Sequence, residues 1–358
     1  MILAGIFLAL IPVSSQAQVA AIPPYSVTTF ASAPSGLSAP DSVTFSSTNV
    51  FVGYGNGGAP DGSGGAMSNV VEYDLKGNLI QNFSNIVGHN DGLRYNPATN
   101  ELWVLQNEDG NANLVTIKLK GGTRKIYQIG TGPHGGGYDD IDFNNKDAYI
   151  SASSPTISPN TAPAIVSLKL KSTKATLATI LNANATVTNV TTGMPEMLNL
   201  QDPDSMIVDP QGELVLDSQA DGEVVIIQYP GLKCQNAFVV PLTSEAGGST
   251  IGDTQFDDTV FTTQSAGELL VADKGLNAIY AITAPYFAAS AYSAVSVFAS
   301  PSAANPSESF IAQTNLTTGF VTPIVNGMSD PAGMAFIPSG VDLAKFVAES
   351  TKIPENCP

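Results

Sequence analysis

Basic residues are scarce in this sequence. Its 358 residues include 14 Lys and Arg against 31 Asp and Glu, so the formal net charge is −17. Nucleic acids and anionic membrane surfaces bind to basic faces, which so acidic a chain does not supply. We therefore expect neither a nucleic acid nor a membrane as a partner.

Long hydrophobic runs are also missing, apart from one near the N-terminus. Residues Ile2–Val13 are apolar but too few to span a bilayer comfortably, and Ser15-Gln16-Ala17 follows with the small residues of a signal cleavage site. No Lys or Arg precedes this run, which is atypical of a signal. We expect residues 1–17 to be a secretory signal peptide. Residues 18–358 should then form one secreted domain, extracellular or periplasmic and monomeric.

Cysteine is limited to two residues, Cys234 and Cys357. A pair is compatible with an exported protein, and a bridge between them would attach the C-terminal tail to the region around residue 234. Two free thiols are the alternative. A bridge requires the two Cα atoms to lie roughly 4.4–6.8 Å apart.

Several catalytic signatures are missing as well. No Gly-x-Ser-x-Gly elbow occurs, so nothing indicates a serine-nucleophile hydrolase. Gly135-Gly136-Gly137 precedes no predicted helix and has no basic residue beside it, so it is a poor phosphate-binding loop. Helical patterns are scarce, while 33 Gly and 24 Pro separate short runs of Val, Ile, Thr, Tyr and Phe. This punctuation indicates an all-β chain.

The sequence does contain a repeat. A six-residue segment that ends in a hydrophobic strand occurs six times, with Asp at its second position in five of them. The segments are PDSVTF (40–45), NDGLRY (90–95), YDDIDF (138–143), PDSMIV (203–208), FDDTVF (256–261) and PAGMAF (331–336). We call the second position, at residues 41, 91, 139, 204, 257 and 332, the key position. A unit of this length that cannot bury its apolar face alone is typical of radial or solenoid repeats.

Each unit predicts four short antiparallel strands joined by turns. In the second unit these strands are Gly92–Tyr95, Glu101–Leu105, Asn113–Leu119 and Arg124–Ile129. Four such strands make one blade, so we predict an all-β, six-bladed β-propeller; five or seven blades are alternatives because residues 283–327 are hard to divide. A β-sandwich has no reason to repeat one aspartate, and a parallel β-helix has shorter rungs. We expect the strand Ser26–Phe30 to pair with Met334–Ile337 and so close the ring with the N- and C-terminal strands.

The repeat places polar residues at one mouth of the ring. First strands begin at the key position, and second strands end on the same face because they run antiparallel. Five aspartates should then face one another, which is costly unless water or a cation neutralises them. Their oxygen ligands suit Ca²⁺, or alternatively Mg²⁺, rather than zinc. The simpler alternative is that each aspartate accepts a hydrogen bond within its own turn.

Other residues are expected at the same mouth. The ends of second strands contribute Asn107, Glu108, Asp217 and Asp273 as candidate substrate-binding residues. The only two histidines, His89 and His134, shortly precede key positions. They are candidate ligands, acid–base groups or plain loop residues.

Two segments resemble those of a known family. Asn90-Asp91-Gly92-Leu93 with Asn100-Glu101-Leu102-Trp103-Val104, and the run from Pro203 to Leu214, are similar to motifs of the senescence-marker-protein-30/gluconolactonase family. NHL-repeat propellers share the weaker general form. The resemblance implies a divalent-metal site in which Asp204 is a ligand and candidate base and Asn90 a ligand or substrate contact. This chain departs from the family pattern at Asp41 and at Asp139, which stands in place of Asn.

Two hypotheses for function follow. The first is a metal-dependent, lactonase-like hydrolase of a small-molecule lactone or ester, in which the ion polarises a carbonyl and Asp204 activates water. His134 and His89 are its further catalytic candidates. Its expected metal ligands are Asp41, Asn90, Asp91, Asp139, Asp204 and Asp257. The second hypothesis is a non-catalytic propeller that binds a ligand or a partner and whose ion is structural.

Overall fold

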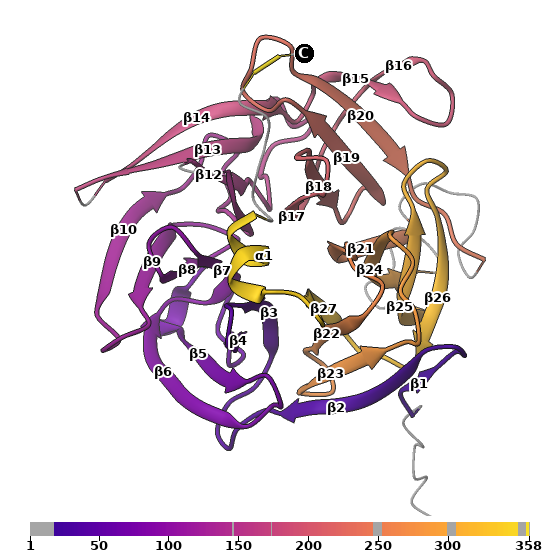
Figure 1. Cartoon of the computed structure of the whole chain (residues 1–358). Coiled ribbons are helices and arrows are strands. Elements are labelled where there is room, and N and C mark those ends of the chain that lie inside the picture. Colours follow the sequence, from indigo (N-terminus) through magenta and orange to yellow (C-terminus); the bar gives the residue numbers. More distant parts are fainter. Residues whose placement is uncertain are drawn as a thin grey trace, which may run out of the picture.

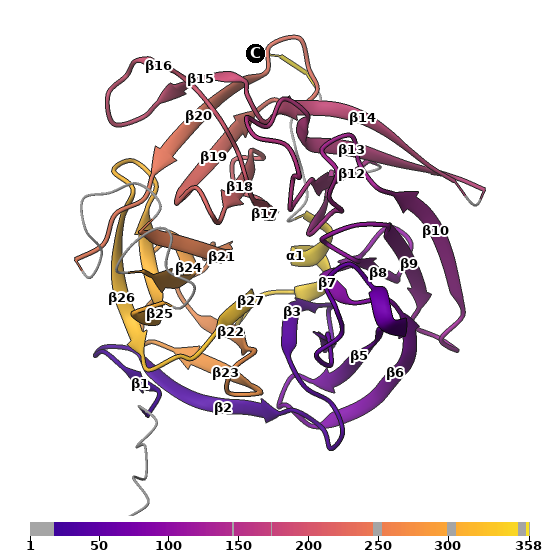
Figure 2. The same ribbon diagram turned by 180° about the vertical axis from the view of Figure 1, so that it is seen from behind.

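The structure is a computed structural model that describes residues 18–144, 147–172, 174–245, 253–298, 306–349 and 356–357. The expected signal peptide, residues 1–17, lies outside the described residues. Strands dominate the described part of the chain, and they form small sheets arranged around one centre (Figures 1 and 2). Mostly antiparallel sheets placed radially in this way are the architecture of a β-propeller. The all-β prediction is therefore confirmed.

The first half of the chain forms two sheets in sequence order. The first sheet contains β3 (Pro40–Phe45), β4 (Asn49–Tyr54), β5 (Met67–Asp74) and β6 (Leu79–Val87). The second contains β7 (Asn90–Asn96), β8 (Glu101–Gln106), β9 (Ala112–Lys118), β10 (Arg124–Gly130), β14 (Lys174–Asn182), β13 (Pro163–Lys171), β12 (Asp147–Ser151) and β11 (Ile141–Asn144). One parallel pair, Gln128 with Lys174, joins its two halves, so it is two four-stranded units meeting at their outer edges.

The third sheet is a four-stranded unit with an added hairpin. Its strands, in order, are β17 (Pro203–Val208), β18 (Leu214–Ser218), β19 (Glu223–Gln228), β20 (Asn236–Pro241), β15 (Thr186–Asn189) and β16 (Pro195–Met197). The hairpin β15–β16 precedes the unit in sequence and extends its outer edge through a parallel pairing of β15 with β20.

The last two sheets exchange strands. One contains β21 (Thr254–Phe261), β24 (Ala291–Val297), β25 (Glu308–Asn315), β26 (Phe320–Asn326) and β1 (Ala20–Ala21). The other contains β27 (Pro331–Pro338), β22 (Gly267–Asp273), β23 (Ala278–Thr283) and β2 (Ser26–Ser32). The chain therefore leaves the sheet of β21 after that strand, forms β22 and β23 in the sheet of β27, and returns to the sheet of β21 at β24.

This exchange corrects one prediction. Ser26–Phe30 was expected to pair with Met334–Ile337, but β2 pairs antiparallel with β23, and Ser26 lies opposite Thr283. The neighbour of β27 is β22, with Leu269 opposite Phe336. The hairpin β22–β23 thus occupies the space between the two terminal strands, which belong to one sheet without touching as a pair.

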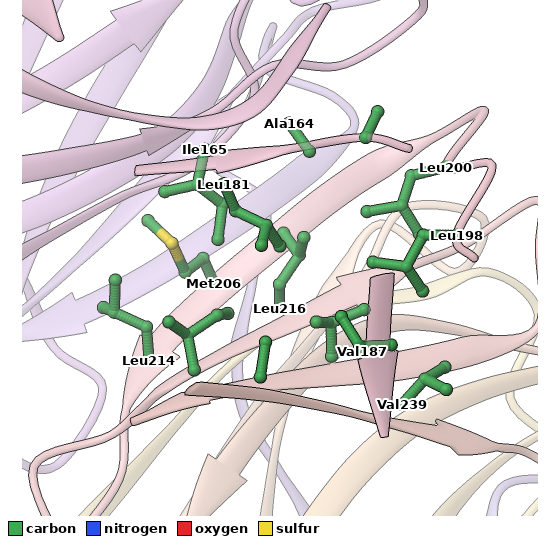
Figure 3. Packing of buried hydrophobic residues seen from close by; sticks show 14 of the residues in the cluster. Ala164, Ile165, Leu181, Val187, Leu198, Leu200, Met206, Leu214, Leu216 and Val239 are labelled. Carbon is green, nitrogen blue, oxygen red and sulfur yellow. The ribbon is translucent and has the colours of Figure 1, made fainter. Parts of the chain in front are cut away.

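Burial explains why the middle strands are so apolar. The strands β4 and β18 (NVFVGY and LVLDS) are almost wholly buried, because both faces of each pack against neighbouring sheets. The outer strand β6 is mostly exposed. Figure 3 shows one inter-sheet cluster, in which Ile165 and Leu181 of β13 and β14 pack with Met206, Leu214 and Leu216. Each such side chain contributes about 1.5–3 kcal/mol to stability.

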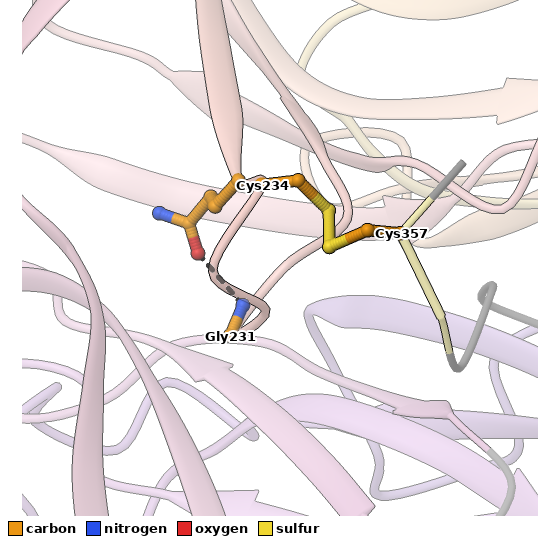
Figure 4. Close-up of a disulfide and its surroundings, with 4 residues drawn as sticks. Gly231, Cys234 and Cys357 are labelled. Atoms are coloured by element: carbon orange, nitrogen blue, oxygen red, sulfur yellow. Dashed lines mark hydrogen bonds between the residues drawn. A yellow bond between two sulfur atoms is a disulfide. The ribbon is translucent and has the colours of Figure 1, made fainter.

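The C-terminal helix lies over one face of the ring. A short helix, α1 (Leu343–Glu349), lies over the centre (Figure 1). Further on, Cys357 forms a disulfide with Cys234 in the turn between β19 and β20, with the two Cα atoms 5.9 Å apart (Figure 4). The predicted bridge is confirmed. Within the described residues, a 3-10 turn at Ser63–Gly65 is the other helical element, and no helix there is long and apolar enough to cross a membrane.

Candidate functional site

In the described part of the chain, the strands β3, β7, β11, β17, β21 and β27 each form one edge of their sheet. Figure 1 shows β3, β7, β17, β21 and β27 on the side of the centre of the ring. Where these inner strands begin, a cavity of about 170 Å³ opens among them. All five aspartates of the key position line it, together with Glu108 and Lys274: Asp41, Asp91, Asp139, Asp204 and Asp257. We call it the carboxylate cavity. The structure therefore brings these residues together, as the repeat predicts.

Local irregularities of the strands turn the aspartates toward this cavity. The ladder between each inner strand and its neighbour skips Asp41, Asp91, Asp204 and Asp257, none of which has a residue paired opposite. Asp139 precedes β11, and its amide donates to Ser151 O over 3.2 Å. Bulges of this kind re-aim side chains and are common beside functional sites.

Glycines let the inner strands approach one another. A Cβ on Gly92 would lie 2.4 Å from Asp139 O, and the Gly92 amide donates to that same oxygen over 2.8 Å. A Cβ on Gly333 would lie 2.5 Å from Asp41 O. Both glycines directly follow a key position. The close approach that they permit places neighbouring key residues side by side.

Crowding and burial make the carboxylates hard to ionise. Burial, followed by the charges of Glu108 and Asp139, raises the pKa of Asp91 well above its ordinary value. Burial and the neighbouring Asp204 do the same to the pKa of Asp139, and these two carboxyl groups share a hydrogen bond. Burial also raises the pKa of Asp257 to about 6. The cavity therefore requires protons or cations to balance its charge.

Lys274 supplies part of that balance. Its Nζ lies 3.3 Å from Asp257 Oδ2 and 3.6 Å from Asp41 Oδ1. Burial alone would lower the pKa of Lys274, but Asp257 and Asp41 raise it instead. Lys274 directly follows β22, and β22 pairs with the inner strand β27. The key position of β27 is Ala332. The one inner strand without an aspartate thus belongs to the unit that provides the lysine.

Three carboxylates of the cavity form a second cluster, and the charge of Lys274 also acts on two of them, Asp91 and Glu108. Ligand atoms of Asp91, Glu108 and Asp139 all lie within 4.8 Å of one another. Asp91 is only 7% exposed, and its Oδ2 is buried without a hydrogen-bond partner. An unpaired, buried carboxylate oxygen is costly, and a bound cation would remove the cost. Three carboxylates with oxygen ligands fit Ca²⁺ or Mg²⁺.

His89 stands at the edge of this group. Its Nε2 lies 3.9 Å from Asp91 Oδ2, and His89, Asp91 and Asp41 form a second set of ligand atoms within 4.8 Å. Asn107 does not line the cavity but holds the backbone of His89. Its side-chain Oδ1 accepts a hydrogen bond from the His89 backbone amide over 3.0 Å, and its own backbone amide donates to His89 O over 2.9 Å. Asn107 is therefore placed to position His89 rather than to contact a ligand.

Two other expected residues face away from the cavity. Asn90 is fully buried, and its Oδ1 occupies the space where a Cβ on Gly53 would stand. His134 is fully buried in the loop before Asp139, with Nε2 2.7 Å from Gly137 O and its ring against Tyr138. Burial lowers the pKa of His134, which keeps the ring neutral. Their contacts hold loops and strands in place.

Asp217 and Asp273 also lie outside the lining. Burial raises the pKa of Asp217 to about 8, and its carboxyl group hydrogen-bonds to Thr259 of the next unit. Asp273 accepts backbone amides of Leu276, Ser329 and Asp330 over 2.8–3.1 Å. Both second-strand aspartates thus satisfy neighbouring polar groups, the local role that short polar side chains often take.

A second polar layer, which was not predicted from the sequence, lies beneath the carboxylate cavity. The Arg94 guanidinium donates to Asp140 Oδ2 over 2.7 Å, to Ile141 O over 2.9 Å and to Met206 O over 3.0 Å. Asp142 and Asp258 accept inner-strand amides of Val208 and Met334. Inner strands have no neighbour on their axial side, so these carboxylates satisfy amides that would otherwise be unpaired. The paired acids Asp139-Asp140 and Asp257-Asp258 were the available signal.

Comparisons with known proteins show likeness in fold only. No protein-family model matches the chain, and no curated protein matches it significantly. A protein provisionally named a gluconolactonase is 10% identical; the match covers 75% of this chain and 94% of that one, with a TM-score of 0.48. A streptogramin B lyase is 10% identical over 88% of this chain and 74% of its own, with a TM-score of 0.41. Virginiamycin B lyase from Staphylococcus aureus is 10% identical over 72% and 99%, with a TM-score of 0.43. These scores are low, and we transfer no activity from them.

Proposed function

We propose that this chain is a six-bladed propeller whose carboxylate cavity binds one divalent cation, Ca²⁺ or alternatively Mg²⁺, and hydrolyses a small lactone or ester. Six blades follow from dividing the eight-stranded sheet at its single parallel pair, which leaves one inner strand for each four-stranded unit. The pairing of β2 with β23 would then close the ring, because it adds the N-terminal strand to the unit of β27. A secreted monomer remains our proposal for the mature chain.

The buried Oδ2 of Asp91, which has no hydrogen-bond partner, carries the metal proposal. It is buried in the carboxylate cavity, and a carboxylate oxygen of Asp91 lies within 4.8 Å of ligand atoms from Glu108 and Asp139. We assign these three carboxylates as the cation ligands, with Asp204 beside them. His89 is near enough to Asp91 to orient it or to serve as an additional ligand.

The chemistry of hydrolysis is divided among the chain's own residues. A divalent cation, when bound, supplies positive charge that polarises a carbonyl oxygen. Asp204 lines the same cavity, so it is placed to take the proton of an attacking water at a carboxylate oxygen. Burial raises the pKa of Asp204, so the positive charge of a bound cation would be needed to keep this carboxyl group ionised as a base. The small cavity admits a compact substrate group. The choice of a lactone or ester rests on the motif resemblance around Asp91 and Asp204.

A non-catalytic function is the second candidate, and Lys274 favours it. The lysine already neutralises two of the carboxylates, and Asp139 engages the proposed base in a hydrogen bond. A cation added to such a ring would serve mainly to stabilise the fold. The site would then bind a ligand or partner without turning it over.

One experiment separates these candidates. Purified protein is incubated with a panel of lactones and esters, with EDTA and with excess Ca²⁺ or Mg²⁺, and thermal melting is recorded in parallel. The hydrolase predicts cation-dependent turnover that falls at least about a hundredfold in Asp204→Asn, because a general base is worth that much. Asp61→Asn, the same change on an exposed loop, is the matched control. A melting temperature raised by cations without turnover would support the non-catalytic propeller, and no cation effect on either would remove both proposals.

A further inference from the structure

A second cavity lies along the central axis of the ring, which we call the tunnel. The polar layer around Arg94 separates this cavity from the carboxylate cavity. The second cavity has a volume of about 590 Å³ and is lined by the later residues of the inner strands. In β3, Asp41 and Ser42 line the carboxylate cavity, Val43 lines both, and Thr44 and Phe45 line only the second. Arg94 also lines both. The two cavities are therefore stacked along the tunnel and share one partition.

The repeat that supplies aspartates to one cavity supplies aromatic residues to the other. Four positions after the key position, five of the six segments have Phe or Tyr: Phe45, Tyr95, Phe143, Phe261 and Phe336, with Val208 in the remaining one. All of these except Phe143 line the second cavity; Phe143 packs edge-on against Trp103 instead. Phe45, Tyr95 and Phe261 keep part of their surface exposed. Apolar walls of this size are typical of small-molecule sites, which measure about 300–1,000 Å³.

The charged groups of the lining already have partners. Arg94 is held by Asp140 and two backbone carbonyls, and Asp142 accepts the amides of Phe143 and Val208. Asp209 accepts the amides of Gln211 and Glu213. An anionic ligand entering this cavity would lose its hydration without gaining a counter-ion, because the Arg94 guanidinium is already paired with Asp140, and this loss is costly. The lining therefore disfavours an anion, and its aromatic and aliphatic residues favour an uncharged ligand.

The helix α1 forms one wall. Phe346 stacks on Phe45 with ring centroids 6.3 Å apart, and Val347 is buried. A seven-residue helix has little stability of its own, so tertiary packing holds it here. Beyond it, the disulfide between Cys357 and Cys234 ties the tail to the ring. The helix is thus held in place by packing and by the disulfide without belonging to a sheet.

We propose that this second cavity is a binding site for an uncharged, largely apolar small molecule, enclosed by the aromatic ends of the inner strands and by Phe346. The site is separate from the proposed hydrolase site, and its occupation does not depend on a cation.

Binding of N-phenyl-1-naphthylamine, an uncharged apolar fluorophore, tests the proposal on the full chain. We expect saturable binding of one probe per chain, unchanged by EDTA and unchanged in Asp204→Asn. Phe346→Ser and Phe261→Ser should each weaken it about tenfold, since an aromatic anchor in a pocket is a typical hot spot. Tyr286→Ser is the matched control, because Tyr286 is 63% exposed and lies outside the cavity. Phe346 lies on the terminal helix, so its variant leaves the strands intact.

Competition tests the charge argument. Decanol should displace the probe at about tenfold lower concentration than decanoate at mildly alkaline pH, because only decanoate would bring an unpaired charge into the cavity. Absence of saturable probe binding would overturn the proposal. So would equal binding by the wild type and both Phe variants, and equal displacement by alcohol and carboxylate would overturn the assignment of an uncharged ligand.

Discussion

Replacement of Lys274 by Gln tests how the carboxylate cavity balances its charge. The lysine Nζ stands between Asp257 and Asp41, at 3.3 and 3.6 Å from their oxygens. Removing one partner of a buried ion pair typically costs about 3–5 kcal/mol, because the other charge is left unpaired. The Lys274 side chain is 28% exposed, so solvent screens part of the interaction. We therefore expect Lys274→Gln to lower the free energy of unfolding by about 2 kcal/mol in EDTA.

The loss of unfolding free energy in Lys274→Gln should depend on cations and on pH. Excess Ca²⁺ should restore most of the stability, because the charge of the bound ion replaces that of the missing Lys274 ammonium group. The pKa of Asp257 is raised to about 6, so this carboxyl group is protonated below that pH and ionised above it. A raised folded-state pKa contributes stability at low pH that is lost as pH rises. The deficit of Lys274→Gln should accordingly be small in acid and grow as pH rises through about 6.

Urea unfolding in EDTA and in excess Ca²⁺, at several pH values, measures these effects. Lys274→Arg keeps the charge and should retain most of the stability, and Lys118→Gln, at an exposed position, should change little. An equal loss with and without Ca²⁺ would refute the electrostatic account. It would show instead that Lys274 acts by packing alone.

Three further predictions concern the frame around the site. Burial and then Asp221 raise the pKa of Glu223 to about 8; Glu223→Gln should therefore stabilise the protein by about 1–3 kcal/mol above that pH and flatten the pH dependence of thermal melting, and no gain at alkaline pH would contradict this. Cys357→Ser should cost about 2–5 kcal/mol in urea unfolding, because the bridge closes a loop of 123 residues; an unchanged midpoint would exclude that role. Deletion of residues 18–32 should expose the edges of β26 and β23 and cause aggregation in light scattering, and a soluble, fully folded variant would argue against it.

Local sequence patterns predicted most of the strands of the fold. In the second unit, the predicted strand Glu101–Leu105 corresponds to β8 and Arg124–Ile129 to β10, each within one residue. Alternation and turn residues specify such strands without knowledge of the rest of the chain. The partners of β22 and β23 could not be read in this way. Both strands look like a continuation of the fifth unit, and only packing against β27 and β2 assigns them to the next sheet.

The site was predictable where symmetry places residues and unpredictable where local geometry turns them. Equivalent positions of a repeat converge in a ring, so the key-position aspartates meet without any knowledge of side-chain direction. Asn90 and His134 lie close in sequence to key positions, yet the bulge in β7 and the contact of the His134 ring with Gly137 O direct their side chains away from the cavity. The sequence places Lys274 at the end of a strand. Its role as the counter-ion of Asp41 and Asp257 depends on the strand exchange that brings β22 beside β27.

The central claim is that the carboxylate cavity holds a divalent cation between Asp91, Glu108 and Asp139. A crystal structure of protein saturated with Mn²⁺ or Ca²⁺, with the ion located by anomalous scattering, tests it most directly. We predict one ion with oxygens of these three residues at about 2.3–2.6 Å for Ca²⁺, absent from crystals of Glu108→Gln. Well-ordered crystals grown in excess cation that show Asp91, Glu108 and Asp139 joined only by protons or water would contradict the claim.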